Sequence, residues 1–206
     1  MQNNLIFLIS LIIFIFLFIG IITNKIEFFD NYIHELILSI RTPNLTNILT
    51  LFTNIGGIIS VSFITLVLTI VMLVLKKRTY SIGIILNVLF SSLIYIVLKN
   101  IIQRPRPPIQ ERLIEEIGYS FPSGHSTNSI AFYGFIIYLI YNNIKNKLLR
   151  NILIIILSIL IFLIGFSRIY LRVHYASDVI AGFCLGIICV ILFISIIYKR
   201  IEKKME

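Results

Sequence analysis

One stretch of the chain joins a polar turn directly to an apolar helix: PSGHSTNSIAFYGFIIYLIY, residues 122–141. Its first residues are small or polar and include His125, whereas its second half is apolar enough to continue into a bilayer. A helix that begins in this way presents free backbone N–H groups, and such helix starts bind anions. Gly124 leaves room for a bound group to approach the backbone. The stretch therefore predicts a membrane helix that begins beside an anion, although an ordinary capped turn with a surface histidine would have the same residues.

The remainder of the chain is also rich in membrane-forming segments. Hydrophobic residues make up 58% of the 206 residues, which is too high a share for a soluble globular protein of this size. The length is that of one domain, so residues 1–206 are predicted to form a single integral-membrane domain with an all-α fold. About 20 apolar residues cross a bilayer as a helix. We expect a bundle of six transmembrane helices, at about 5–23, 50–75, 80–98, 127–142, 151–167 and 179–198.

Between the first two expected spans, residues 24–49 carry apolar side chains at helical spacing. These are Ile26, Phe29, Ile33, Leu36, Ile37 and Ile40, with Asp30, His34 and Glu35 among them. The pattern predicts an amphipathic helix that lies at the membrane interface. We interpret His34 as a solvated interfacial residue and not as a ligand.

The net charge of +9 is explained by where the basic residues fall along the chain. If the N-terminus is cytoplasmic, the cytoplasmic segments carry ten basic residues and only two acidic ones, Glu202 and Glu206. The ten are Lys76, Lys77, Arg78, Lys145, Lys147, Arg150, Lys199, Arg200, Lys203 and Lys204. The outer segments carry eight basic and seven acidic residues, which nearly balance. The positive-inside rule therefore predicts that both termini are cytoplasmic, and the basic excess gives no reason to expect a nucleic-acid partner.

Three polar clusters lie beside the expected spans, where ionisable groups are costly and usually functional. They are Lys99 with Arg106-Pro107, then Pro122-Ser123-Gly124-His125, and finally Ser167-Arg168 with His174 and Asp178. The first two clusters share the connection between the third and fourth spans, and the last lies between the fifth and sixth. All three are therefore predicted on the same, extracytoplasmic side of the membrane, where they can form one site.

The last cluster has the residues of a nucleophile and its orienting partner. His174 and Asp178 are four positions apart, so on a helical turn they share a face. A carboxylate beside one imidazole nitrogen fixes the tautomer and leaves the other nitrogen free. His174 is then a candidate to attack phosphorus. The same pair also fits a hydrogen bond that only stabilises the start of a helix.

The other two clusters supply an acid–base group and fixed positive charge. His125, beside a bound phosphate, can protonate the departing oxygen and later activate water. Lys99, Arg106 and Arg168 can neutralise the nonbridging oxygens as charge develops in the transition state. Arginine suits this task because its planar fork holds two oxygens at once. Alternatively, such cations anchor the protein to lipid headgroups, which is the interpretation we prefer for Arg112.

Together the clusters read Lys-x6-Arg-Pro, Pro-Ser-Gly-His and Ser-Arg-x5-His-x3-Asp. This pattern resembles the signature of the type 2 phosphatidic acid phosphatase superfamily, with all eleven specified positions present in order. The resemblance covers a catalytic core of about 99–178. The expected six-span layout is similar to the integral-membrane lipid phosphatase branch of that superfamily, and implies a core like that of acid phosphatases and vanadium haloperoxidases.

The resemblance implies a role for each matching residue. His174 would be the nucleophile that forms a phosphohistidine, Asp178 its orienting partner, and His125 the general acid and base. The phosphate-binding residues would be Lys99, Arg106, Ser123, Gly124 and Arg168. No metal and no other cofactor is implied.

Two further arginines lie inside the clusters without a role in the signature. Arg104 belongs to the first of two Arg-Pro pairs, and only Arg106, in the second pair, has the family spacing from Lys99. Arg172 falls where many relatives carry a small residue. Both are candidates for the rim of the site, and headgroup anchoring fits them equally well.

The implied activity is removal of the terminal phosphate from a lipid phosphate or diphosphate on the extracytoplasmic face of the cell membrane. The substrate favoured by the outward-facing site is undecaprenyl diphosphate, and the alternatives are phosphatidylglycerophosphate, phosphatidic acid and diacylglycerol diphosphate. A vanadium haloperoxidase is disfavoured because those enzymes are larger and soluble. A non-catalytic lipid carrier or assembly factor would not require both histidines and Asp178. The expected partners are the lipid substrate and the bilayer, with no obligate protein partner evident.

Overall fold

Long apolar runs form the helices of the structure, and short polar or glycine-containing breaks separate them. The computed structural model describes residues 2–205; residues 1 and 206 of the predicted domain lie outside the described residues. The helices are α1 (Gln2–Ile22), α2 (Glu27–Ser39), α3 (Pro43–Ile55), α4 (Ile58–Val74), α5 (Arg78–Ile102), α6 (Gly124–Asn143), α7 (Lys147–Tyr170), α8 (Ala176–Leu192) and α9 (Lys199–Met205). A 3₁₀ turn covers Ile109–Glu111, and a π-helical segment, Phe193–Tyr198, joins α8 to α9. The described chain contains no strand, so the all-α prediction is confirmed.

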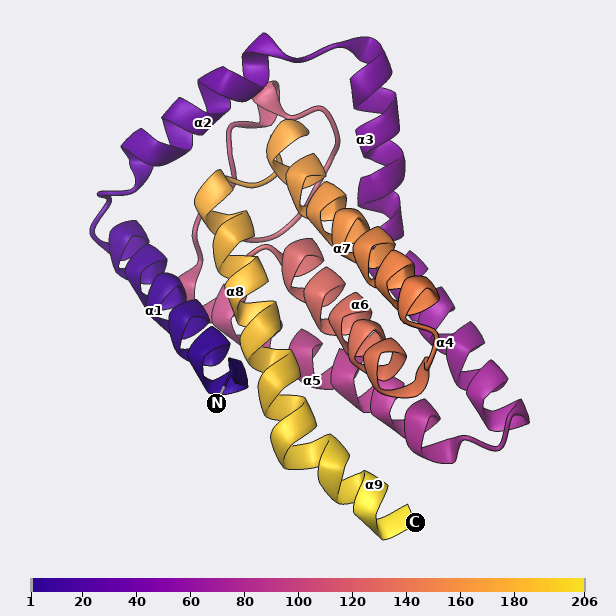
Figure 1. The fold of residues 1–206 in the computed structure, drawn as a ribbon. Coiled ribbons are helices and arrows are strands. Elements are labelled where there is room, and N and C mark those ends of the chain that lie inside the picture. The colour runs from indigo at the N-terminus through magenta and orange to yellow at the C-terminus, as the bar shows by residue number, and fades with distance from the viewer. Residues whose placement is uncertain (1, 206) are drawn as a thin grey trace.

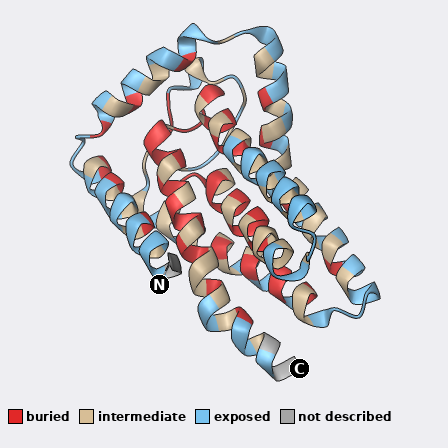
Figure 2. Cartoon of the chain, viewed as in Figure 1, coloured by how far each residue is buried: buried red, intermediate tan, exposed pale blue. Residues whose placement is uncertain are grey.

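Helix α6 lies at the centre of the bundle. It packs against α5, α7 and α8, while α1 packs on α8, α3 on α7 and α4 on α5 (Figure 1). The largest cluster of buried apolar side chains includes Phe132 and Phe135 of α6, Ile164 of α7, and Phe193 and Tyr198 beyond α8. Buried residues concentrate on α6 and α8, whereas the outward faces of the other helices are exposed (Figure 2).

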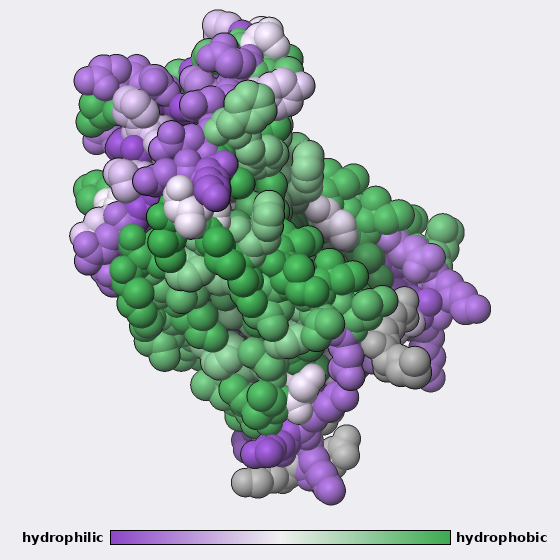
Figure 3. All heavy atoms as spheres, turned by 90° about the vertical axis from the view of Figure 1, so that its left-hand side faces the viewer, coloured by the Kyte–Doolittle hydropathy of each residue, from purple (hydrophilic) through white to green (hydrophobic). Residues whose placement is uncertain are grey.

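The exposed faces of the outer helices are apolar, as a lipid environment requires. On the face drawn in Figure 3, a broad hydrophobic band separates hydrophilic groups at the upper end from others at the lower end and side. Large apolar side chains that are exposed on the outer helices include Leu5 and Phe16 of α1, Phe63 of α4 and Phe162 of α7. In water such a surface would cause aggregation, so the band marks the part of the molecule that the bilayer covers.

The expectation of six spans is not confirmed. Within residues 2–205, four helices are long and apolar enough to cross a membrane, and the bent pair α3 and α4 makes a fifth if it is counted as one span. The four are Asn4–Ile22, Arg78–Ile102, Lys147–Tyr170 and Ala176–Ile201. Helix α6, predicted as a span at 127–142, is not among them because its first turns are polar. Its central position explains this, since a helix surrounded by other helices need not match the lipid.

The single interfacial helix predicted for 24–49 is wrong in detail, because the segment forms two helices, α2 and the first half of α3. The chain turns at 40–42, where Pro43 begins α3 and the Thr42 hydroxyl caps it by accepting the Leu45 N–H at 3.3 Å. A second break follows at Gly56 and Gly57, inside the span predicted at 50–75, and bends α3 from α4 by 50°. A Cβ on Gly56 would lie 2.3 Å from Ile164 Cγ2, so glycine permits α3 to pack closely on α7.

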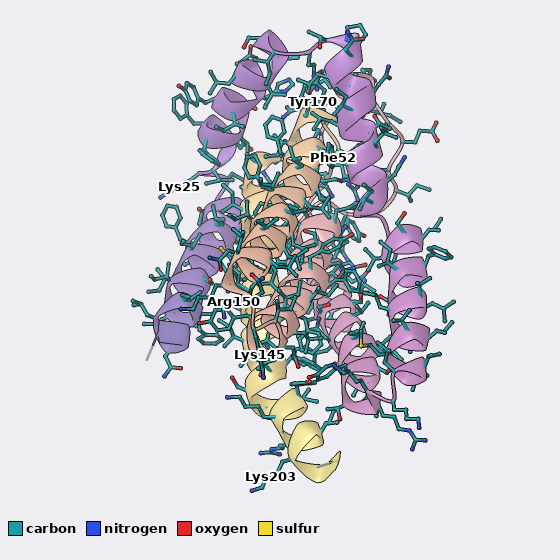
Figure 4. The ribbon with its side chains drawn as sticks, turned by 45° about the vertical axis from the view of Figure 1, so that its right-hand side comes forward. Lys25, Phe52, Lys145, Arg150, Tyr170 and Lys203 are labelled. Atoms are coloured by element: carbon teal, nitrogen blue, oxygen red, sulfur yellow. The ribbon has the colours of Figure 1, made fainter. Side chains whose placement is uncertain are left out.

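The two ends of the bundle differ in what they carry. The long connection 103–123, helix α2 and the upper part of α3 gather at the end where α7 finishes and α8 begins (Figure 1). Lys145, Arg150 and Lys203 lie toward the opposite end from Phe52 and Tyr170 (Figure 4). The side chains of Glu202 and Lys204 are outside the described part. These three cations, which are predicted to be cytoplasmic, thus lie toward the opposite end of the molecule from Tyr170 at the end of α7.

Candidate active site

Helix ends bring the three polar clusters to one place. Lys99 lies in the last turn of α5 and His125 in the first turn of α6, while Arg168 lies in the last turn of α7. His174 belongs to the short connection between α7 and α8, and Asp178 to the first turn of α8. A pocket of about 540 Å³ opens among them. Its lining includes Lys99, Arg106, Gly124, His125, Arg168 and His174, which are six of the residues that the sequence singled out.

The imidazole of His174 is buried with its two nitrogens in different surroundings. Nδ1 lies 3.5 Å from Oδ2 of Asp178 and 3.3 Å from Oγ of Ser120. The Ser120 hydroxyl itself donates to Asp178 Oδ2 at 2.5 Å, so it bridges the two residues. Nε2 lies on the other side of the ring, 3.1 Å from Nη1 of Arg106. The ring therefore has one nitrogen held by the carboxylate and the other turned toward the cations of the pocket.

The surroundings of His174 favour its neutral form. Burial lowers the pKa of His174 well below the usual value of 6.5, and the positive charges of Arg106, Arg168 and Lys99 lower it further. At neutral pH the ring is then uncharged, so Nε2 keeps a lone pair that it can donate to an electrophile.

Two arginines of the pocket are fixed by groups of the protein before any ligand binds. Arg106 donates from Nε to the Gly118 carbonyl at 2.8 Å, from Nη1 to the Val173 carbonyl at 2.7 Å, and from Nη2 to the Ile117 carbonyl at 3.1 Å. Arg168 donates from Nη1 to the Thr53 hydroxyl of α3 at 2.5 Å. Both guanidinium groups are buried, so their orientation is set without cost at the moment of binding.

Ser123 and Gly124 shape the start of α6 more than they line the pocket. The Ser123 hydroxyl caps the helix by accepting the Ser126 N–H at 3.4 Å, and the Ser123 N–H donates to the Asp178 carbonyl at 3.1 Å. A Cβ on Gly124 would lie 2.9 Å from Cε2 of Tyr95, so the missing side chain makes room for that ring. Ser123 thus has the helix-capping role that the sequence offered as an alternative, whereas the packing of Gly124 against Tyr95 was not predicted.

The carboxylate of Glu116 already lies between the two pocket arginines. It pairs with Nη2 of Arg168, and its Oε1 lies 3.7 Å from Nη2 of Arg106. Glu116 comes from the long connection 103–123, and its side chain is 26% exposed to solvent. A carboxylate and a phosphate present similar oxygens to arginine, so Glu116 takes the place that a bound phosphate would occupy.

Among the described residues that line the pocket, Arg104, Arg112 and Arg172 are absent. Arg104 donates to Asp178 Oδ1 at 2.6 Å and to Asp30 Oδ2 of α2 at 2.7 Å. Arg172, with a positive φ of 56°, donates to Glu111 at 2.9 Å. Arg112, interpreted as a headgroup anchor, donates from Nε to the Pro107 carbonyl at 2.7 Å and so braces its own connection.

Sequence reasoning missed Ser120, Glu116 and the role of Asp30. A signal for Asp30 was available, because it falls on the apolar stripe formed by Ile26, Ile33 and Ile37. A carboxylate on the buried side of a helix needs a charged or hydrogen-bonding partner. No comparable pattern marks Ser120 or Glu116, which reach the site through the irregular connection before α6.

The donor groups at this end are therefore suited to a tetrahedral anion. A neutral histidine nitrogen faces two buried arginines and a lysine, with a second histidine in the same pocket. In the described part of the chain, no three side chains of His, Cys, Asp or Glu are grouped as metal ligands. The fold and site together define an integral-membrane protein that binds phosphate-like groups at one end of its helical bundle.

Comparison with known proteins identifies the family. Residues 80–202 match the model of the PAP2 superfamily, which is more than half of the chain. The chain belongs to the PAP2 superfamily, the type 2 phosphatidic acid phosphatases, and the resemblance seen in the motifs is confirmed. It is a membrane phosphatase of lipid phosphates.

Individual relatives and solved structures agree with this assignment. The chain is 32% identical over 201 residues to phosphatidylglycerophosphatase B of Bacillus subtilis (strain 168), covering 94% of this chain and 93% of the relative. It is 34% identical over 128 residues to dolichyldiphosphatase of Saccharomyces cerevisiae, covering 56% of this chain and 49% of that protein.

Two crystal structures have the same fold. The transmembrane PAP2-type phosphatidylglycerolphosphate phosphatase from Bacillus subtilis matches with a TM-score of 0.83 and 29% identity, over 99% of this chain and 97% of that one. Aquifex aeolicus LpxE matches with a TM-score of 0.64 and 28% identity, over 80% of this chain and 93% of that one. The expected PAP2 membrane phosphatase fold is therefore confirmed.

Replacing Glu116 with glutamine should strengthen phosphate binding. The change keeps the shape of the side chain but removes the negative charge that competes for Arg106 and Arg168. We expect the dissociation constant for inorganic phosphate to fall by roughly fivefold or more, measured by calorimetry on the purified protein. Glu35→Gln is the matched control, because it removes the same charge from an exposed position of α2 that does not line the pocket. Equal or weaker phosphate binding by the Glu116 variant would contradict this interpretation.

Proposed function

We propose that the protein hydrolyses the terminal phosphate of phosphatidylglycerophosphate through a phosphohistidine intermediate. The observation that carries this substrate is the similarity, over nearly the whole chain, to phosphatidylglycerophosphatase B. The sequence alone favoured undecaprenyl diphosphate because of the predicted outward-facing site. The full-length similarity supports phosphatidylglycerophosphate better, since it extends beyond the shared motifs to α1, α2 and α3.

In the first step, Nε2 of His174 attacks the phosphorus atom. A P–N bond forms while the P–O bond to the glycerol breaks, and His125 donates a proton to the departing oxygen. Burial and the nearby cations keep the pKa of His125 well below 6.5 in the free protein, so His125 takes up this proton when the anionic phosphate binds. Asp178 and Ser120 hold Nδ1, so that Nε2 is presented to the pocket. The contact between Nε2 and Arg106 gives way to a phosphate oxygen, which the guanidinium then binds.

The second step reverses these proton movements. His125, now neutral, removes a proton from water as the water oxygen attacks the phosphohistidine. The P–N bond breaks, inorganic phosphate forms, and His174 returns to its neutral state. In both steps Lys99, Arg106 and Arg168 offset the charge on the three nonbridging oxygens. For this, the substrate phosphate must displace the carboxylate of Glu116.

The start of α4 offers a place for the lipid tail. Ile58 and Ile59 line the same pocket as His125, and both have exposed apolar side chains. A lipid whose phosphate lies among the arginines can therefore leave its acyl chains against α4 and the surrounding bilayer. This arrangement supports a lipid phosphate over a small soluble ester.

We also propose that the site opens on the extracytoplasmic side, with both termini in the cytoplasm. Support comes from the basic connections, which lie at the opposite end of the bundle from the polar clusters (Figure 4). The positive-inside rule assigns such basic connections to the cytoplasm.

A polyprenyl diphosphate is the second candidate substrate. The observation in its favour is the similarity to a dolichyldiphosphatase across 128 residues. Because that match covers 56% of this chain, it supports the shared reaction more than the shared lipid. Phosphatidic acid and diacylglycerol diphosphate have no comparable observation in their favour.

A panel of purified lipids would decide between the two substrates. We expect kcat/KM for phosphatidylglycerophosphate to exceed that for undecaprenyl diphosphate by roughly tenfold or more, measured as phosphate release in mixed micelles. The opposite order would favour the second candidate, and no release from any lipid phosphate would overturn the proposed function.

The His174→Ala variant should lose phosphate release by at least about 1,000-fold, because the group that forms the P–N bond is absent. His34→Ala is the matched control, since it removes a histidine of α2 that does not line the pocket. Thermal unfolding of both variants in detergent checks that they are folded. Turnover near the wild-type level in a folded His174 variant would contradict its role as nucleophile.

Cysteine labelling would test the proposed orientation. Ile117 is 94% exposed in the connection beside the site, and Lys145 is exposed at the opposite end. In intact cells, a membrane-impermeant maleimide should modify Ile117→Cys but not Lys145→Cys, because only the former faces outward. Labelling of Lys145→Cys alone would show that the topology is inverted.

A further inference from the structure

The oxygen of Asp178 that faces away from His174 is bound by a second ion pair. Arg104 Nη1 donates to Asp178 Oδ1 at 2.6 Å, and Arg104 Nη2 donates to Asp30 Oδ2 at 2.7 Å. The guanidinium also lies over the Tyr175 ring, 4.1 Å from its centroid. Arg104 therefore joins a carboxylate of α2 to the carboxylate that orients His174.

Ser177 closes this arrangement. Its N–H donates to Asp30 Oδ1 at 2.9 Å, its hydroxyl donates to Asp30 Oδ2 at 2.7 Å, and the same hydroxyl accepts from Arg104 at 2.8 Å. The Asp30 and Asp178 side chains are 1% and 0% exposed, and that of Arg104 is 10% exposed. Each buried charge here has a charged partner and additional hydrogen bonds, which burial requires if the groups are to stay ionised.

The pair lies away from the phosphate pocket. Asp30 and Arg104 line a separate hollow of about 420 Å³ at the junction of α1 and α2, together with Glu27 and Tyr175. The pocket that contains both histidines is lined instead, among the described residues, by Arg106, Arg168 and Lys99. Neither Asp30 nor Arg104 is therefore placed to touch the substrate phosphate.

The charges of the three groups explain why a second carboxylate is present. Arg104 alone would neutralise Asp178 and weaken its attraction for the positive charge that develops on the His174 ring as Nε2 bonds to phosphorus. Asp30 offsets Arg104, so the trio keeps a net charge of about −1 beside the ring. Arg104 also accepts the Ser120 N–H at its backbone carbonyl at 2.8 Å, which places the hydroxyl that bridges Asp178 and His174.

We propose that Asp30 and Arg104 are positioning residues, which hold Asp178 in the geometry and charge state that His174 requires for attack. The proposal rests on the proposed function, because it assigns a role in the same reaction. It makes α2, the amphipathic helix at this end of the bundle, a structural part of the active site. A residue that orients the nucleophile without touching substrate should affect turnover and leave substrate binding unchanged.

The first test compares Asp30→Asn with Glu35→Gln. Both remove one negative charge from α2, but Glu35 is exposed on the helix surface. With a short-chain phosphatidylglycerophosphate in detergent micelles, we expect Asp30→Asn to lower kcat by roughly tenfold or more with KM within about twofold of wild type. Glu35→Gln should match wild type in both constants. Equal kcat values for the two variants would overturn the proposal.

The second test asks whether the two residues act as one unit. Arg104→Gln should also lower kcat, and the variant with both Asp30→Asn and Arg104→Gln should lose no more than the worse single variant. Losses that multiply, or a KM that rises in step with the fall in kcat, would contradict a shared action through Asp178.

The variant with both substitutions can replace a single variant in this test if the single variant fails to fold because it leaves a buried charge unpaired. It removes one charge of each sign, so the remaining Asp178 keeps its net charge. Reduced kcat at unchanged KM in this variant supports the proposal, and wild-type kcat overturns it. An inactive wild-type protein on the same lipid would instead refute the proposed function, so the two failures are distinguishable.

Discussion

The carboxylate of Asp178 is fully buried, and groups from several parts of the chain converge on it. Ser120, Arg104 and the Tyr175 N–H hydrogen-bond to its two oxygens, and His174 lies beside it. Removing a carboxylate from water is costly unless its oxygens are bound and its charge is offset. The long connection before α6 and the short connection between α7 and α8 supply these groups at the start of α8, and so offset this cost.

The same constraint explains the preorganised pocket. Arg106 and Arg168 are buried, and the protein's own carbonyls and Thr53 hold their guanidinium groups in place before any ligand binds. Glu116 pairs with the two arginines in the free protein, and in the proposed mechanism the anion displaces it. Its charge therefore lowers affinity for the phosphate product as well as for the substrate, which assists release.

The motif residues and the helical class could be predicted from the sequence because they depend on local spacing. His174 and Asp178, for example, are close in the chain and remain close in the fold. The breaks at 40–42 and at Gly56 were not predicted, although Thr42-Pro43 and Gly56-Gly57 mark them in the sequence. Only the structure shows that Gly56 lies against Ile164 of α7. The partners of Asp30 and Glu116 could not be predicted, although the place of Asp30 on an apolar stripe indicated that it needs one. Their contacts join segments that are far apart in the chain and connect through irregular backbone.

The central claim is that His174 carries the phosphoryl group between the lipid and water. Rapid mixing with a lipid labelled with ³²P on its terminal phosphate, followed by an alkaline quench and peptide mapping, tests this directly, because phosphohistidine survives alkali. The account predicts label on the peptide that contains His174 in the wild-type protein and none in His174→Ala. Label on another residue, or no label on His174 in a wild-type protein that releases phosphate, would contradict it.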